Sequence, residues 1–221
     1  MVSTRTQNAE EYLEILFRLQ HGGESVTVKR LAQELGVSSA SASEMCRRLK
    51  KAGLVTRPDG TRGGLMLTEQ GVAEGASLVR RHRLSERFLV EYLDMPWDAV
   101  HDEACKFEHV LSPEVEARLA EQLGNPLTCP HGHAIPDENG EIAEEDLRSL
   151  STLGAGESGV IVCVTEEKGD LLRYLASLGL LPDTAVSVQS VAPFNGPLLV
   201  RVGDAQYALG REVTDKIMLR G

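Results

Sequence analysis

Residues 82–109 read HRLSERFLVEYLDMPWDAVHDEACKFEH and predict two helices, with a break at residues 95–97 where a proline interrupts the pattern. On the first helix, His82 and Glu86 are four residues apart and lie on one side. On the second helix, a turn of about 100° per residue places four potential metal ligands on one face, namely His101, Cys105, Glu108 and His109. Such a face is poorly suited to a hydrophobic core and well suited to binding a divalent cation.

The spacing of these ligands predicts two metal ions. On one continuous helix, His101 and His109 lie about 12 Å apart along the axis, at a rise of about 1.5 Å per residue. One ion does not easily span that gap, since metal–nitrogen distances are about 2.0–2.1 Å even for zinc. One ion is therefore expected at His82, Glu86 and His101, and the other at Cys105, Glu108 and His109. Each residue taken alone is equally consistent with a solvated surface group, but the gathering of all of them on two adjacent helices favours metal binding.

The composition is that of an ordinary globular protein, and 221 residues allow one large domain or two to three small ones. The sequence has no apolar run of the roughly 18–20 residues that cross a bilayer, and residues 1–16 lack the basic-then-apolar plan of a signal peptide. The four cysteines are widely scattered, which argues against a disulfide framework and favours a reducing compartment. These features predict a cytoplasmic protein.

The net charge of −10 argues against nucleic-acid binding only until its distribution is considered. Residues 76–150 carry 7 Lys or Arg against 16 Asp or Glu, whereas residues 1–75 carry 10 against 9. Within residues 44–62 the balance is basic, with a net charge of +4. A basic patch on one domain suffices for contacts with DNA phosphates. The acidic middle of the chain fits a cation-binding region, and it fits a solvated helical surface equally well.

A helix-turn-helix followed by a β-hairpin wing is predicted near the N-terminus. Helices are expected at 8–20 with Asn8 as its cap, at 28–35, and from the cap Ser38 to residue 51, with a turn at Gly36 between the last two. Short strands are expected at 54–57 and 64–68, around a turn at 58–60. The alternative is a small helical bundle with solvated Lys and Arg, and the basic wing argues against it.

The third helix and the wing carry the residues suited to DNA. Small side chains at the helix start let the backbone approach base edges, and the basic residues that follow suit phosphates. Glu44 offers only acceptors, which suits cytosine amino groups. The predicted DNA-contacting residues are Ser38, Ser39, Ala40, Ser41, Ser43, Glu44, Arg47, Arg48, Lys50, Arg57 and Arg62.

The rest of the chain changes character near residue 150. Before that point, helices are expected at 72–93, 97–110 and 113–123, followed by a loop at 124–136 and an acidic linker at 137–148. After it, strands are expected at 159–164, 185–191 and 197–202, with a short helix at 170–178. The predicted fold class is therefore α+β with several domains.

Residues 9–124 resemble the diphtheria toxin repressor family of metal-dependent transcriptional regulators. The resemblance rests on the helix-turn-helix and wing and on the segments AEEYLEIL (9–16), RRHRLSERFL (80–89) and VHDEACKFEHVLSPEVEARL (100–119). Residues 150–220 are similar to the SH3-like domain of many family members and of ferrous-iron transport accessory proteins, through LASLGLLPDTAVSV (175–188) and APFNGPLLVRVGDAQYALGREV (192–213).

The resemblance implies a homodimer that binds a pseudo-palindromic operator on double-stranded DNA. It also implies a winged-helix DNA-binding domain at 1–75, an all-α dimerisation and metal-binding domain at 76–136, a linker at 137–148 and a small SH3-like β-barrel at 149–221. The implied ancillary metal site is His82, Glu86 and His101, completed by Glu166, Glu167 or Asp170. The implied primary site is Cys105, Glu108 and His109, together with Glu11 and a further candidate, Glu14.

The resemblance implies Mn(II) or Fe(II), two ions per chain. Iron-responsive members have methionine at the position of Glu11, and the carboxylate here resembles the manganese-responsive members. We therefore expect a Mn(II)-sensing repressor, with an Fe(II)-dependent repressor as the alternative. A metal-dependent hydrolase is a remote alternative, because two-metal hydrolases hold their ions about 3.5–4 Å apart. Residues 129–133, CPHGH, are also ligand-like, but their spacing is no standard zinc pattern and favours a structured interdomain loop.

Overall fold

The computed structural model describes residues 6–23, 25–57, 64–143 and 145–221. They form two compact units, whose boundary passes through helix α4 (Glu69–Leu93) after His82. The first unit holds the described residues up to His82 together with 107–113 and 136–142, and the second unit holds the others. No helix in the described ranges is long and apolar enough to cross a membrane.

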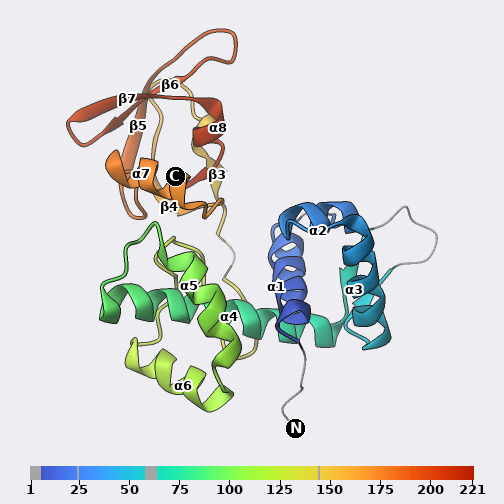
Figure 1. Cartoon of the computed structure of the whole chain (residues 1–221). Helices are drawn as coiled ribbons and strands as arrows, with labels where there is room; N and C mark the ends of the chain where they lie inside the picture. The colour runs from blue at the N-terminus through green and yellow to red at the C-terminus, as the bar shows by residue number, and fades with distance from the viewer. Residues whose placement is uncertain (1–5, 24, 58–63, 144) are drawn as a thin grey trace. The chain divides into compact units, whose positions relative to one another are not determined.

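The first unit is a winged helix-turn-helix domain (Figure 1). Its helices are α1 (Gln7–His21), α2 (Val28–Glu34) and α3 (Ser39–Lys51). The Thr27 side chain caps α2 by accepting from the Arg30 backbone N–H, and Ser38 caps α3 by accepting from Ser41 N–H. The expected cap Asn8 is wrong, because α1 begins at Gln7 with Thr6 at the cap position and Asn8 falls inside the first turn.

The wing strands are shorter than expected. Strand β1 (Val55–Thr56) pairs antiparallel with β2 (Met66–Leu67), and Leu65 forms an isolated bridge with Val26. The helices and this small sheet enclose one core that includes Leu13, Leu16, Leu31 and Leu49. The expected turn at 58–60 and the candidate DNA contact Arg62 lie outside the described residues.

The second ligand-bearing helix is shorter than the expected 97–110. Helix α5 covers Val100–Phe107, and Glu108–Val110 continue as the 3₁₀ helix η1. A tighter last turn is common at helix ends, and Leu111 is already extended ahead of Pro113, which starts α6 (Pro113–Gln122). The angles that a continuous α-helix gives for Glu108 and His109 therefore do not apply.

The C-terminal part of the second unit is an antiparallel sheet of six strands in the order β3-β8-β4-β5-β6-β7 (Figure 1). The strands are β3 (Arg148–Ser149), β4 (Ser158–Val164), β5 (Ala185–Val191), β6 (Leu198–Val202), β7 (Ala205–Leu209) and β8 (Ile217–Arg220). The 3₁₀ helix η2 (Leu150–Thr152) and helices α7 (Gly169–Ser177) and α8 (Arg211–Thr214) accompany them.

The sequence pattern predicted β4, β5, β6 and α7, but it did not predict β3, β7 and β8. Irregular pairing at Ile161/Cys163 and at Val188/Ser190 bends it, as bulges do. Its core contains Ile161, Leu172 and Leu198, and Trp97 from the segment before α5 packs against this core. The expected α+β fold, with a helix-turn-helix, a helical part and an SH3-like sheet, is confirmed.

Candidate metal centres and nucleic-acid interface

Three buried ligand-type side chains meet in the first unit. Glu14 comes from α1, His82 from α4 and Glu108 from η1, and one ligand atom of each lies within 4.8 Å of the others. Their exposed fractions are 5%, 3% and 1%. His82 Nδ1 lies 2.6 Å from Glu108 Oε2. Burial raises the pKa of Glu108, and the hydrogen bond with His82 opposes that rise.

Two further residues extend this group, and we call the five the α1 cluster: Glu10, Glu14, His82, Glu108 and His109. His109 Nδ1 lies 2.7 Å from Glu10 Oε2, and its Nε2 lies 3.5 Å from Glu108 Oε1. Among the described residues, Glu14 Oε1, Glu108 Oε1 and His109 Nε2 are buried without a hydrogen-bond partner, and the Glu14 oxygen has only the longer ion-pair contact with Arg18 Nη1, at 3.5 Å. A buried polar atom left in that state is costly. Two carboxylate oxygens and an imidazole nitrogen are donors that a divalent cation accepts, so these residues fit a metal ion.

A second group lies in the second unit. Glu86 on α4, Cys129 and His131 in the loop after α6, and Glu167 between β4 and α7 each place one ligand atom within 4.8 Å of the others. Glu86 and His131 are fully buried. Burial, together with Glu86 and Glu167, raises the pKa of the Cys129 thiol well above its usual value. We call Glu86, His101, Cys129, His131 and Glu167 the loop cluster.

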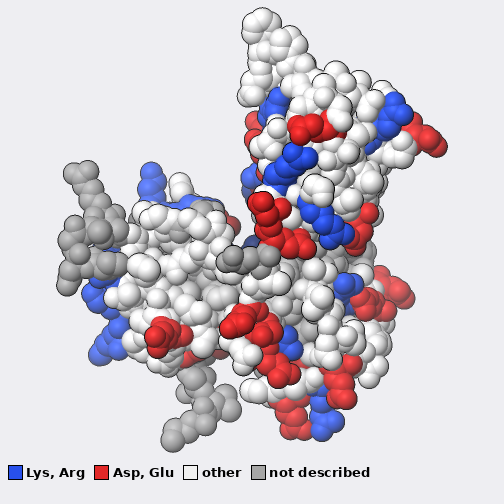
Figure 2. Space-filling model, turned by 180° about the vertical axis from the view of Figure 1, so that it is seen from behind, with Lys and Arg blue, Asp and Glu red and all other residues white. Residues whose placement is uncertain are grey.

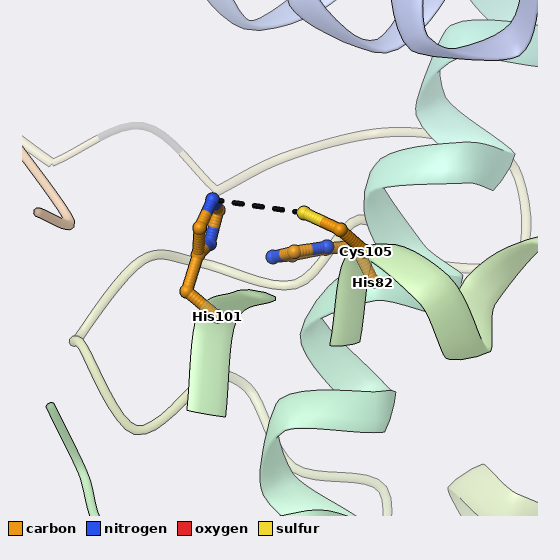
Figure 3. A group of neighbouring side chains, drawn as sticks. All are labelled: His82, His101 and Cys105. Atoms are coloured by element: carbon orange, nitrogen blue, oxygen red, sulfur yellow. Dashed lines mark hydrogen bonds between the residues drawn. The ribbon is translucent and has the colours of Figure 1, made fainter. Parts of the chain in front are cut away.

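His101 joins the loop cluster from α5. Its Nδ1 lies 2.9 Å from Glu167 Oε2 and 3.4 Å from Glu86 Oε1. Its Nε2 faces the Cys105 sulfur at 3.7 Å, the dashed contact in Figure 3, where His82 is also drawn on its own helix. Burial lowers the pKa of His101, but the hydrogen bonds to Cys105, Glu167 and Glu86 outweigh it and raise the pKa to about 12.

The hydrogen bonds of His131 favour a cation at this place. Its Nε2 lies 2.9 Å from the Trp97 carbonyl oxygen, which only accepts, so Nε2 carries the proton. A neutral His131 then turns the Nδ1 lone pair toward Glu86 Oε1, 3.1 Å away. Two lone pairs face each other unless the ring or the carboxyl group is protonated or a cation lies between them. The donor set of the loop cluster therefore also fits a metal ion.

Backbone carbonyls of the loop are held by three donors of the second unit. The Trp97 indole N–H donates to the Pro130 carbonyl over 2.8 Å, and Arg87 Nε donates to the Thr128 carbonyl over 2.7 Å. Arg83 donates to the Ala134 carbonyl. These bonds fix the loop and so position Cys129 and His131.

The predicted ancillary ligands Glu86, His101 and Glu167 belong to the loop cluster, and His82 belongs to the α1 cluster, one turn before Glu86 on α4. The structure brings Glu86, His101 and Glu167 together, and it places His82 beside Glu108 in the first unit. The other two candidates from the SH3-like domain point elsewhere. Glu166 pairs with Lys168 and Lys216, and Asp170 pairs with Arg173 at a fully exposed position.

The predicted primary ligands come from α5, η1 and α1. Glu108 and His109 lie in the α1 cluster, whereas Cys105 lies in the second unit next to His101. On α1, Glu14 joins Glu108, while Glu11 is half-buried and belongs to none of the close donor groups among the described residues. Glu10, Cys129 and His131 were not predicted as ligands. The CPHGH segment was the signal for the last two, and Glu10 had none.

The predicted DNA-contacting residues that the structure describes are all exposed on α3, at its cap and after β1. In the face drawn in Figure 2, Lys and Arg side chains border the winged-helix part, and Asp and Glu are prominent on the helical part. Glu44 forms an ion pair with Arg47 across one turn of α3, with both side chains more than half exposed. The surface of α3 thus presents alternating small, acidic and basic groups.

Three known protein-family profiles match consecutive parts of the chain. Residues 5–59 match the iron dependent repressor N-terminal DNA binding domain, residues 68–137 the iron dependent repressor metal binding and dimerisation domain, and residues 148–221 the FeoA domain. These matches cover the helix-turn-helix with the first wing strand, both ligand-bearing helices and the SH3-like sheet.

Whole-chain relatives agree with the profiles. The chain is 36% identical to the iron-dependent repressor IdeR of Mycobacterium tuberculosis over 220 residues, 94% of each chain. It is 31% identical to the diphtheria toxin repressor of Corynebacterium efficiens, covering 93% of this chain and 95% of that one. It superposes on a manganese-dependent transcriptional repressor in complex with manganese with a TM-score of 0.88 at 34% identity, covering 96% and 98%. The chain therefore belongs to the iron-dependent repressor family of metal-dependent DNA-binding transcriptional repressors.

Proposed function

We propose that this repressor senses Mn(II) through the α1 cluster and represses genes of metal homeostasis when the metal is plentiful; Fe(II) is the alternative activator. The observation that carries the proposal is the α1 cluster itself. It joins α1 of the DNA-binding domain to η1 and to α4, and it contains buried carboxylate oxygens without hydrogen-bond partners among the described residues.

Metal binding at the α1 cluster restrains the DNA-binding domain. Without an ion, the carboxylates of Glu10, Glu14 and Glu108 rely on pairing with His109, Arg18 and His82, which holds α1 less firmly than a cation shared by all of them. An ion neutralises them and links α1 to the residues of the metal-binding domain. Because Leu13 and Leu16 pack in the same core as the helix-turn-helix, a restrained α1 also restrains α3. The ion thus favours one of two conformations.

The donors of the α1 cluster support manganese. All are carboxylate oxygens or imidazole nitrogens, and hard oxygen donors suit Mn(II). The loop cluster adds the Cys129 thiolate, a softer donor that also accepts Fe(II) and later metals. Manganese and iron both occur in the names of the relatives. We therefore propose at least two ions per chain, one in each cluster.

A homodimer on a pseudo-palindromic operator completes the proposal. Exposed apolar side chains of the helical part of the second unit are available for a second copy of the chain; they are Tyr92, Leu93, Val115 and Leu127. A two-fold dimer presents two α3 helices to half-sites about 34 Å apart, one helical turn of DNA. Arg47, Arg48 and Lys50 then contact phosphates, which makes binding weaken with salt.

The proposed function is tested with the full-length chain and fluorescently labelled genomic fragments of its own organism. Binding should disappear with chelator and return with Mn(II), with a second arm under anaerobic Fe(II). Arg47→Ala should weaken binding to all fragments, and Arg201→Ala on the exposed face of β6 is the matched control. Equal binding with and without chelator contradicts the proposal, and a response to Fe(II) at lower concentrations than to Mn(II) replaces manganese by iron.

A further inference from the structure

The loop cluster holds more donors than one ion uses. Four of them, Glu86, Cys129, His131 and Glu167, lie within 4.8 Å of one another and complete a coordination sphere with solvent. His101 is a fifth donor, and it forms its own close group with the same two carboxylates. The two sets therefore share Glu86 and Glu167 and differ in their other ligands.

The orientation of Glu167 separates the two sets. Its Oε2 lies 2.9 Å from His101 Nδ1, while its Oε1 lies 3.8 Å from His131 Nδ1 and 3.2 Å from His133 Nε2. Each oxygen of one buried carboxylate thus faces a different imidazole. Glu86 also lies between the two rings, since its Oε1 is 3.1 Å from His131 and 3.4 Å from His101. Carboxylates in this position are suited to bridging two ions.

Neighbouring groups orient the ligands. The Cys105 sulfur faces His101 Nε2, which leaves Nδ1 directed at the two carboxylates. His133 Nε2 lies 3.0 Å from the Val164 carbonyl oxygen and therefore carries a proton, which it also directs toward Glu167. His133 is thus a positioning residue for the bridging carboxylate. Such outer partners commonly fix the orientation of metal ligands.

We propose that the loop cluster binds a carboxylate-bridged pair of divalent cations. One ion is held by Cys129 and His131, the other by His101, and Glu86 and Glu167 are shared. Ions that share carboxylates in this way are typically about 3.5–4 Å apart. The inference rests on the proposed function for metal binding as such, and it adds a third ion per chain to the one in the α1 cluster. The second ion binds more weakly, because the first has already neutralised part of the shared negative charge.

The test measures bound Mn(II) and its electron paramagnetic resonance in the full-length chain, in a Glu108→Ala background that removes the α1 ion. The expected result is two Mn(II) per chain with an exchange-coupled spectrum. His101→Ala and His101→Gln should each lose one ion and show an uncoupled six-line spectrum. Asp102→Ala, an exposed neighbour on α5, is the matched control and should keep both ions and the coupling.

A second measurement separates the two ions. With Co(II), the parent should show a sulfur-to-cobalt charge-transfer band from Cys129, which Cys129→Ser removes and His101→Gln retains. One Mn(II) per chain in the background, or a coupled spectrum that survives both His101 changes, overturns the bridged pair. Metal-dependent DNA binding by the parent is measured in parallel. If the parent shows no metal-dependent DNA binding, the proposed function is contradicted. If it shows such binding but an uncoupled spectrum, only the bridged pair of ions is contradicted.

Discussion

The α1 cluster and the loop cluster differ in the structure that holds them and in their donors. Every side chain of the α1 cluster comes from a helix, either α1, α4 or η1, and every donor is oxygen or nitrogen. The loop cluster takes Cys129 and His131 from an irregular loop and Glu167 from a connection between a strand and a helix. Its donors include the sulfur of Cys129.

This difference separates the two proposed roles. The α1 cluster joins α1 of the DNA-binding domain to α4 and η1, and we therefore propose that an ion bound there alters the domain that meets DNA. The loop cluster joins the helical part of the second unit to the SH3-like sheet, through Glu167 on one side and His101 and His131 on the other. We propose that its softer set of donors suits an ion that holds those parts together. If the two roles are divided in this way, substitutions in the α1 cluster should change metal-activated DNA binding most, and substitutions in the loop cluster should change metal affinity and stability.

The largest effect is expected from neutralising Glu14, the buried carboxylate that α1 contributes to the α1 cluster. Glu14→Gln should weaken Mn(II) activation of DNA binding by at least about tenfold, a loss of roughly 1.4 kcal/mol, because it removes a charged donor that is 5% exposed. Glu11→Gln is the matched change one turn earlier and should alter activation little. Mn(II) titration of DNA binding by fluorescence anisotropy measures both. A larger loss for Glu11→Gln would return the ligand role to Glu11.

That pair of variants addresses the residues for which sequence pattern was least decisive. Helical spacing places Glu11 and Glu14 on neighbouring parts of the same surface, and only the packing of α1 shows which one is buried near Glu108. The α+β fold, the helix-turn-helix and the long ligand-bearing helix were predictable, because they rest on apolar periodicity and capping residues over many positions.

Other structural features could not be predicted from apolar periodicity or capping residues. Cys129 and His131 lie in a loop, where no periodicity indicates which way a side chain points, and hydrogen bonds from Trp97 and Arg87 decide their placement. The change from α-helix to 3₁₀ helix at Glu108 turns that residue toward His82 rather than along the α5 face. Strand β7 has the sequence Ala-Gln-Tyr-Ala-Leu, which contains no β-branched residue and only one aromatic one, so its composition did not predict a strand.

An intermediate effect is expected from the thiolate of the loop cluster. Cys129→Ser should weaken Co(II) and Zn(II) binding more than Mn(II) binding, because a hydroxyl is a harder and poorer donor than a thiolate. The parent should also release a proton on binding, since burial keeps the Cys129 thiol protonated in the metal-free protein. Calorimetry in buffers of different ionisation enthalpy measures affinity and proton release together. Cys46→Ser, in the core of the winged helix, is the control and should leave both quantities unchanged.

The smallest effect is expected for the pH dependence of the metal-free protein. Because the pKa of His101 rises from 6.5 to about 12 on folding, its protonated form stabilises the folded state fully below pH 6.5. That contribution then declines as the pH increases through the window up to about 12. In the presence of chelator, the midpoint temperature of thermal unfolding should therefore decrease as the pH is raised from 7 to 9. His101→Gln should make this dependence of the midpoint on pH less steep. The decrease should amount to a few degrees, since about 1 kcal/mol shifts the midpoint by roughly 2–4 °C in a chain of this size.

In the metal-loaded protein an ion replaces the proton on Nδ1, so the pH dependence should be less steep there too. An equally steep pH dependence in parent and variant would show that His101 is not protonated between the two carboxylates. The charges of Glu86 and Glu167 would then not be balanced by His101 in the metal-free protein, and this difference from the α1 cluster would disappear.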